Sequence, residues 1–172
     1  NATVSLSVIK AGQVFIGSQP LSPQKFGETA DADEQATQYL ATGVQLFQDY
    51  ALEFEIKVLS AAGSGYEQIF RFADDEQRTI RGLTYENRFP AVFLKKGSSS
   101  LHIRQATVNY ANDGGDPNTP LSIGEWVHVK ITMVGTIYSV TFDGLTVYIR
   151  TTMPERVTSD DANLFFSSSN YK

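Results

Sequence analysis

The chain has 172 residues, a formal net charge of −5 at pH 7 and no cysteine. Its hydrophobic share of 41% excludes a chain too polar to bury a core, so we expect a folded protein, and the length suits one domain over residues 1–172. Without cysteine, a disulfide scaffold, a thiol nucleophile and thiolate-bound zinc are excluded.

The excess of acidic over basic residues also limits the classes of partner that the chain can bind. With 14 Lys and Arg against 19 Asp and Glu, no basic field exists to displace the counterions of a nucleic acid. No apolar run approaches the roughly 18 residues that a spanning helix needs, so we expect no membrane insertion. The oligomeric state is not indicated by the sequence.

Apolar and polar residues alternate with a period of two along most of the chain, which is typical of strands with one buried face. In residues 51–58, Leu52 and Phe54 share one face, whereas Glu53, Glu55 and Lys57 share the other and are expected in water. Strands are predicted, in chain order, over residues 2–9, 51–58, 69–72, 91–94, 101–108 and 126–134.

A hairpin is predicted next along the chain. Residues 138–142 and 145–150 flank Asp143-Gly144, a pair that tolerates the positive φ of a two-residue turn. A second tight connection, Gly135-Thr136, joins the hairpin to residues 127–134. We therefore expect three consecutive antiparallel strands over residues 126–151.

A short helix is a possible prediction only for residues 31–40, with Asp31 or Asp33 as its N-cap. A polar loop fits this segment equally well. Loops are predicted over residues 63–65, 74–76, 97–100 and 112–120. Many short strands separated by Gly, Ser, Asn and Asp clusters indicate an all-β, two-sheet antiparallel sandwich or jelly roll.

Motifs of the common enzyme classes are absent from the sequence, and we expect no catalysis. His102 and His128 each lie in a predicted strand, where a packing role is the ordinary one. Glu53 and Glu55 share a strand face at a spacing near the roughly 5 Å that a retaining glycosidase needs. A solvated strand face is the alternative for this pair.

One polar loop, residues 112–118, is a candidate calcium site. Calcium takes six to eight oxygen ligands, and the loop offers carboxylates and amides from Asp113, Asp116 and Asn118. The same residue types also make ordinary turns, so a turn without a metal is the alternative.

Two segments combine a tyrosine with amide or guanidinium groups, a pattern that suits sugars, whose apolar face stacks on a ring while hydroxyls take hydrogen bonds. The alternative is that the tyrosines are rim residues that half cover the core. The single tryptophan, Trp126, lies in a predicted strand and is expected in the core. The candidate ligand-binding residues are Tyr85, Asn87, Arg88, Asn109, Tyr110 and Asn112.

The start of the chain, Asn1-Ala2-Thr3, matches the acceptor pattern for N-glycosylation, which predicts Asn1 as a modified residue of an extracellular glycoprotein. A chance match to this three-residue pattern is the alternative.

Two stretches resemble a known family. Residues 121–132, which contain Trp126, and residues 138–144, which end in Asp143-Gly144, resemble the pattern G-x-W-h-h-V-x-I-t … v-x-v-D-G of laminin-G-like domains. These domains belong to the wider concanavalin A-like lectin/glucanase group. Residues 50–57, 85–94, 101–104 and 162–168 are similar to strands of that group in the same order.

The resemblance implies a jelly roll of about a dozen strands that binds glycans or extracellular proteins, in some members through calcium at a sheet rim. The glucanase branch carries Glu-x-Asp-x-x-Glu, and residues 53–58 lack the Asp and the final Glu, which disfavours a glycosidase. Many members continue beyond the equivalent of Tyr171 into a closing strand, so we expect this chain to be a piece of a longer protein.

Taken together, these patterns predict a secreted, non-catalytic module that binds carbohydrate, with Ca²⁺ as a candidate cofactor and a glycan or extracellular protein as partner. A structural or adhesive extracellular-matrix protein is the alternative, and a glycoside hydrolase is the third hypothesis.

Overall fold

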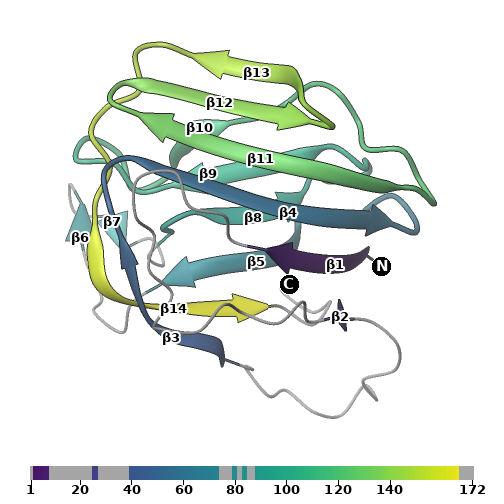
Figure 1. Ribbon diagram of the computed structural model, residues 1–172, viewed down its shortest axis with the longest axis horizontal. Coiled ribbons are helices and arrows are strands. Elements are labelled where there is room, and N and C mark those ends of the chain that lie inside the picture. The colour runs from purple at the N-terminus through teal and green to yellow at the C-terminus, as the bar shows by residue number, and fades with distance from the viewer. Residues whose placement is uncertain are drawn as a thin grey trace.

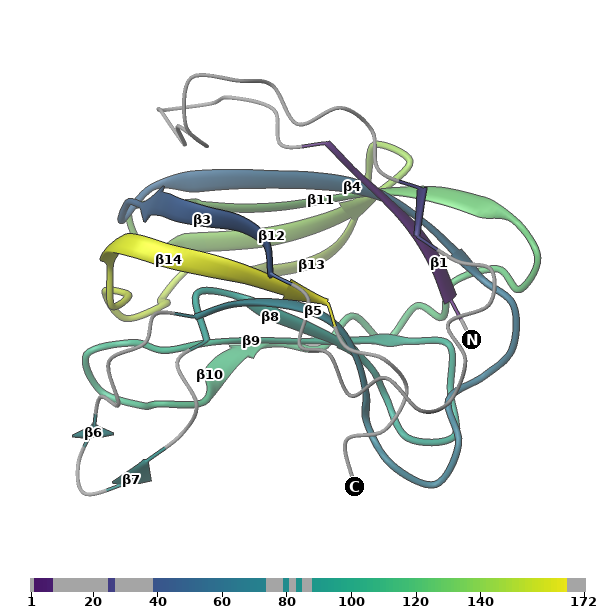
Figure 2. The ribbon, with the colours of Figure 1, turned by 90° about the horizontal axis from the view of Figure 1, so that it is seen from below.

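The computed structural model describes the backbone of residues 2–7, 25–26, 39–73, 79–80, 83–84 and 88–166. Every regular element in these residues is a strand (Figure 1), so none of them forms a helix that could cross a bilayer. The strands form two six-stranded antiparallel sheets that lie as two layers (Figure 2), together with one two-stranded sheet. The predicted all-β sandwich and its dozen main strands are confirmed.

The first sheet has the strand order β13-β12-β11-β4-β1-β2. Its centre joins β4 to β11, strands far apart in the sequence, with Phe54 opposite Val129. The strands are β1 (Ala2–Ser7), β2 (Lys25–Phe26), β4 (Tyr50–Val58), β11 (Trp126–Val134), β12 (Ile137–Phe142) and β13 (Leu145–Arg150).

The second sheet has the order β10-β9-β8-β5-β14-β3, so that β10 is an edge strand beside β9. Its strands are β3 (Tyr39–Leu46), β5 (Glu67–Ala73), β8 (Ala91–Leu94), β9 (Leu101–Gln105), β10 (Asp113–Gly115) and β14 (Ser159–Phe166). The two-stranded sheet consists of β6 (Thr79–Ile80) and β7 (Leu83–Thr84).

The core lies between the two six-stranded sheets. Alternate residues of strands such as β9, β11 and β12 point inward, and Phe54 of β4 meets Phe70 of β5 edge to face with ring centroids 5.0 Å apart. Burial of one such side chain contributes about 1.5–3 kcal/mol, and about two dozen apolar residues of the described part of the chain share this core. Apolar burial therefore holds the two layers together.

A few buried polar groups also join the layers. The Tyr50 hydroxyl donates to Gln105 Oε1 at 2.8 Å, and burial raises the pKa of Tyr50 to about 12. Arg156 is completely buried, with its guanidinium 4.3 Å from the Tyr50 ring centroid and Nη2 donating to the Phe89 carbonyl at 3.1 Å. Burial lowers the pKa of Arg156, because a charged group loses its hydration inside the core.

The predicted hairpin is present. Asp143 and Gly144 have φ values of 47° and 82°, the left-handed conformation that this turn requires. Asp143 Oδ1 accepts a hydrogen bond from the His128 N–H at 2.9 Å, and the His128 carbonyl accepts one from the Asp143 N–H at 2.8 Å. These bonds tie the turn to the neighbouring strand β11.

Two burial predictions were wrong. Trp126 was expected in the core, but it is 46% exposed, because Val127 and Val129 point inward and the alternation turns Trp126 outward. Glu53 was expected in water, but it is only 8% exposed, because the side chains of His128 and Lys130 lie against it.

Some element boundaries also differ. Tyr39 and Leu40, in the segment predicted as helix or loop, begin strand β3, whereas residues 31–38 lie outside the described residues. Asp113–Gly115, predicted as loop, pairs with β9 as strand β10, and β9 itself ends at Gln105 rather than at residue 108. The predicted loop at residues 74–76 lies outside the described residues.

Strand β10 depends on a glycine. A Cβ added to Gly114, whose φ is 147°, would lie 2.2 Å from the Ile103 carbonyl oxygen, whereas a Cβ at Gly65 meets nothing within 4 Å. We expect Gly114→Ala to lower the free energy of unfolding by about 1–3 kcal/mol and Gly65→Ala to change it by less than about 0.5 kcal/mol. Urea unfolding of both variants measures this, and equal stabilities would contradict the described register of β10.

Candidate functional site

The outer surface of the second sheet carries a group of polar and aromatic side chains. Along β9, Leu101, Ile103 and Gln105 point into the sandwich, which forces His102 and Arg104 outward. His102 lies opposite Phe93 of β8, and Arg104 lies opposite Gly114 of β10. We call this surface the β8–β10 face and define it by Tyr66, Arg88, Phe93, Lys95, His102, Arg104, Asn112 and Asp116.

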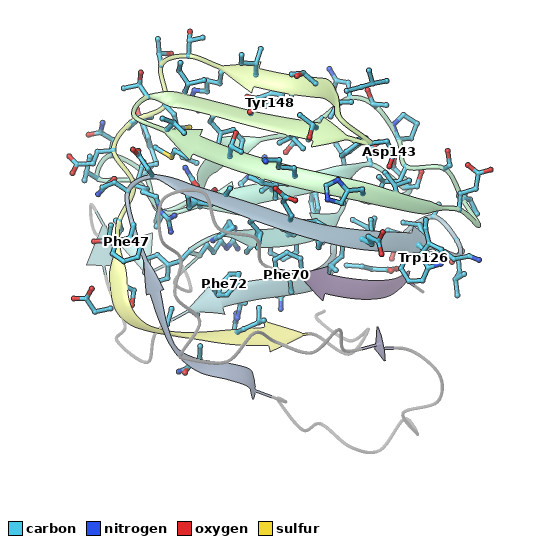
Figure 3. The ribbon with its side chains drawn as sticks, in the orientation of Figure 1. Phe47, Phe70, Phe72, Trp126, Asp143 and Tyr148 are labelled. Carbon is cyan, nitrogen blue, oxygen red and sulfur yellow. The ribbon has the colours of Figure 1, made fainter. Side chains whose placement is uncertain are left out.

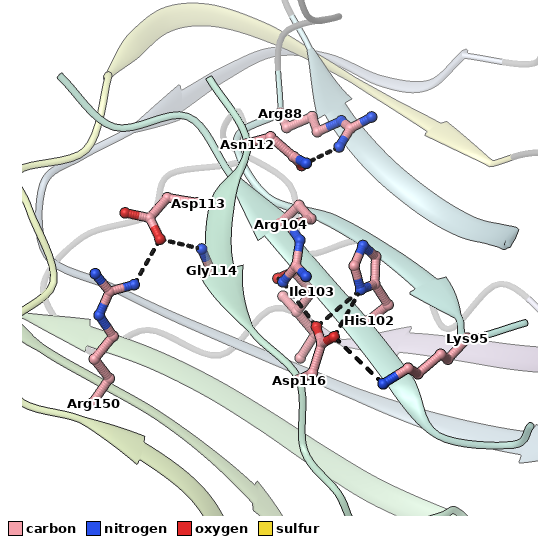
Figure 4. A network of polar contacts seen from close by, with 10 residues as sticks. All are labelled: Arg88, Lys95, His102, Ile103, Arg104, Asn112, Asp113, Gly114, Asp116 and Arg150. Carbon is pink, nitrogen blue, oxygen red and sulfur yellow. Dashed lines mark hydrogen bonds and ion pairs between the residues drawn. The ribbon is translucent and has the colours of Figure 1, made fainter. Parts of the chain in front are cut away.

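Asp116 collects three basic side chains on this face, as Figure 4 shows. Its Oδ1 lies 2.8 Å from Arg104 Nη1 and 2.9 Å from His102 Nδ1, and its Oδ2 lies 3.8 Å from Lys95 Nζ. Arg104 Nη1 also donates to the Ile103 carbonyl at 2.9 Å. One partly buried carboxylate thus fixes the orientation of two side chains of β9.

Burial and the nearby Arg104 guanidinium lower the pKa of His102, although the hydrogen bond with Asp116 acts in the opposite direction. The lowered pKa favours the neutral form of the imidazole. A neutral ring that donates from Nδ1 to Asp116 keeps Nε2 as an acceptor. The face then offers an acceptor on His102 beside the donors of the arginines.

Two aromatic rings contact His102. The Tyr66 ring lies 4.4 Å from the imidazole, centroid to centroid, and Tyr66 is 45% exposed. The Phe93 ring meets the imidazole edge to face with centroids 5.9 Å apart, and the Arg88 guanidinium lies 5.4 Å from the Phe93 centroid. A partly exposed aromatic ring beside hydrogen-bonding groups is an arrangement that suits a sugar.

The structure brings together some of the predicted ligand-binding residues. Arg88 Nη1 donates to Asn112 Oδ1, which joins the segment before β8 to the one before β10. Tyr110 is exposed in the turn between β9 and β10, where its N–H donates to Thr107 Oγ1 at 3.1 Å, and Asn109 is half-buried in the same turn. Tyr85, Asn87 and the predicted glycosylation site Asn1 lie outside the described residues.

Tyr66 and His102 were missing from the predicted site. A tyrosine placed directly after Gly63-Ser64-Gly65 and before a strand is a signal that a loop aromatic is available for binding. His102 gave no signal of its own, because its partners Tyr66 and Asp116 come from other strands and loops.

The predicted calcium ligands do not form one site. Asp113 Oδ1 lies 2.6 Å from Arg150 Nη1 of β13 and accepts from the Gly114 N–H, whereas Asp116 faces the cations of the β8–β10 face (Figure 4). Asn118 is exposed. In the part of the chain that the structure describes, no three His, Asp or Glu side chains are grouped to hold a metal ion. Calcium binding stays a prediction, and it requires Asp113 or Asp116 to exchange a cationic partner for the ion.

One carboxylate of the pair considered for a glycosidase is also engaged. Glu53 Oε1 lies 2.7 Å from Lys130 Nζ, and Glu53 Oε2 lies 3.4 Å from His128 Nε2. Glu55 is exposed on the same sheet face. Glu53 is thus held in an ion pair rather than presented as a nucleophile.

Comparison with known proteins supports the fold alone. No protein-family model and no curated protein matches the sequence. A solved structure, a native heptameric SAP-like pentraxin from Limulus polyphemus, matches with a TM-score of 0.51 at 11% identity. The match covers 95% of this chain and 63% of the pentraxin chain, so this chain spans less than two thirds of that protein. The jelly-roll fold implied by the sequence resemblance is confirmed, and membership of the laminin-G-like family stays a prediction.

The lowered pKa of His102 gives the stability a pH dependence. The unfolded histidine, with its ordinary pKa of 6.5, takes up a proton before the folded one, so the free energy of unfolding falls as the pH drops below about 6.5. Arg88, Arg104 and Asp116 are the charged groups facing the ring.

Denaturation at pH 7.5, 6.5 and 5.5 measures this slope. In His102→Gln the slope should become shallower, while His128→Gln serves as the matched control. An unchanged slope in His102→Gln would show that the ring titrates equally in both states.

Proposed function

We propose that this chain is a non-catalytic carbohydrate-binding module and that the β8–β10 face holds the glycan. The observation that carries the proposal is the exposed Tyr66 ring, tilted against His102 at 4.4 Å, beside polar groups fixed by Asp116. One face of the ring can take the C–H face of a pyranose while neighbouring side chains bind its hydroxyls.

The polar groups of the face supply both halves of a sugar's hydrogen-bonding needs. Arg88 and the Asn112 amide offer N–H donors, whereas His102 Nε2 and the Asp116 carboxylate offer acceptors. Because these side chains already contact one another, little conformational entropy is lost when a ligand binds. Preorganisation of this kind favours binding over mere solvation of a strand face.

The charge of the face favours an acidic glycan. Arg88, Lys95 and Arg104 carry three positive charges against the one negative charge of Asp116, a local net of +2 on a chain whose total is −5. Guanidinium groups bind carboxylate and sulfate oxygens through charge-assisted hydrogen bonds. We infer that the ligand carries such groups. A secreted, extracellular setting belongs to the proposal and rests on the sequence resemblance.

A second candidate function is a structural or adhesive matrix protein that acts through protein contacts. It is favoured by exposed aliphatic side chains on β11–β13, where Val134 lies opposite Ile137 and Ile149 lies on the neighbouring strand. Exposed apolar groups at a sheet edge are typical of a protein interface.

A glycan array of neutral and sulfated or uronic oligosaccharides tests the proposal, read once with calcium and once with a chelator. We expect acidic glycans to bind, Tyr66→Ala to weaken them about 2- to 10-fold, and Tyr66→Phe to retain most affinity because the ring is kept. Arg88→Ala should also weaken the acidic glycans, because it removes one positive charge from the face.

Three results discriminate the alternatives. Binding lost in the chelator arm would support the calcium hypothesis. Binding that Tyr66→Ala and Arg88→Ala leave unchanged would place the ligand elsewhere. The adhesive alternative would be favoured if no glycan on the array binds, the chain captures a matrix protein, and Ile149→Lys abolishes that capture.

A further inference from the structure

The outer surface of the first sheet carries an exposed tryptophan. Trp126 is the only tryptophan of the chain and lies at the end of β11 beside β4 (Figure 3). The residue is 46% exposed, on a surface that the alternation of β11 turns away from the core. Packing in the core does not account for its position.

Polar side chains lie next to this ring across the β4–β11 pair. Lys57 is directly opposite Trp126, and Glu55 is directly opposite His128, two residues further along. Directly opposite residues of an antiparallel pair have Cβ atoms about 4.5–5.5 Å apart, so these four side chains form one surface. We call it the Trp126 platform: Glu55, Lys57, Trp126 and His128.

Groups beneath and beside the platform hold it in place. The buried carboxylate of Glu53 lies 3.4 Å from His128 Nε2 and 2.7 Å from Lys130 Nζ. The backbone of His128 is fixed in turn by its two hydrogen bonds with Asp143. A buried carboxylate is costly unless it is paired with a charged or hydrogen-bonding group, and Glu53 is only 8% exposed. Its contact with His128 therefore restricts rotation of the imidazole.

We propose that the Trp126 platform is a second saccharide site, which takes a neutral pyranose with its C–H face on the indole. Glu55 and His128 Nδ1 accept from the sugar hydroxyls, because His128 Nε2 already faces Glu53. Lys57 and the indole N–H donate to the hydroxyls. Glu53 and Glu55 carry two negative charges, and Lys57 and Lys130 carry two positive ones, so the surroundings favour a neutral ligand. The inference rests on the proposed function as a carbohydrate-binding module but uses a different face.

The two faces belong to different sheets and point away from each other, since each is the outer side of its own layer. A module with saccharide sites on both outer sides can hold two glycan chains at once. Bridging of an acidic and a neutral glycan is therefore the function that follows from the pair of sites.

The single tryptophan makes the test direct, because all indole fluorescence reports from Trp126. Titration of the chain with cellohexaose, mannohexaose and xylohexaose should give a saturable change in emission with at least one of them. Adding about 0.5 M salt, which reduces the Debye screening length to a few ångströms, should weaken this binding much less than it weakens binding of the acidic glycan. Calorimetry of Trp126→Ala should show about a tenfold or greater loss of affinity, with Trp126→Phe intermediate.

Arg88→Ala is the control, because it changes only the β8–β10 face and should leave the affinity for the neutral hexasaccharide unchanged. The inference is overturned if none of the three sugars changes the emission at millimolar concentration, or if Arg88→Ala weakens the neutral sugar as much as Trp126→Ala does. Neutral binding that persists when no acidic glycan binds would instead overturn the proposed site and leave the Trp126 platform standing.

Discussion

The alternation of side chains along each strand is the constraint on which both surfaces depend. A strand that gives every second residue to the core must send the others outward, and in β9 the burial of Leu101 and Ile103 leaves His102 and Arg104 no other direction. In β11 the burial of Val127 and Val129 exposes Trp126 and His128 in the same way. The apolar core therefore stabilises the fold and also sets the positions of the side chains that we propose as saccharide ligands.

Acidic side chains then turn these outward residues into ordered surfaces. Asp116 draws His102 and Arg104 together on one side of the sandwich, and Glu53 does the same for His128 and Lys130 on the other. The two surfaces differ in charge because Asp116 faces more cations than it neutralises. An acidic chain can thus present one locally cationic face and one neutral face.

The sequence correctly predicted those features of the fold that depend on residues adjacent in the chain. The Asp143-Gly144 hairpin was correct because its turn depends on two adjacent residues, and the strand over residues 51–58 was correct because its alternation is regular. The prediction that Trp126 is buried was wrong, because alternation defines the two faces of a strand but does not decide on which face an aromatic residue at the end of the strand lies. Strand β10 was missed because Asp-Gly-Gly has low strand propensity and forms only by pairing with β9, which sends Asp113 and Asp116 to different partners. Tyr66 and His102 meet only in the folded sheet.

The most direct measurement of the central claim is an NMR titration of the isotope-labelled chain with a sulfated hexasaccharide. If the β8–β10 face is the site for acidic glycans, the largest chemical-shift changes will fall on the amides of Tyr66, His102 and Asn112 and on the Arg88 side chain, while the Trp126 indole resonance stays in place. Changes centred on β11–β13, or no saturable change at all, would contradict the account.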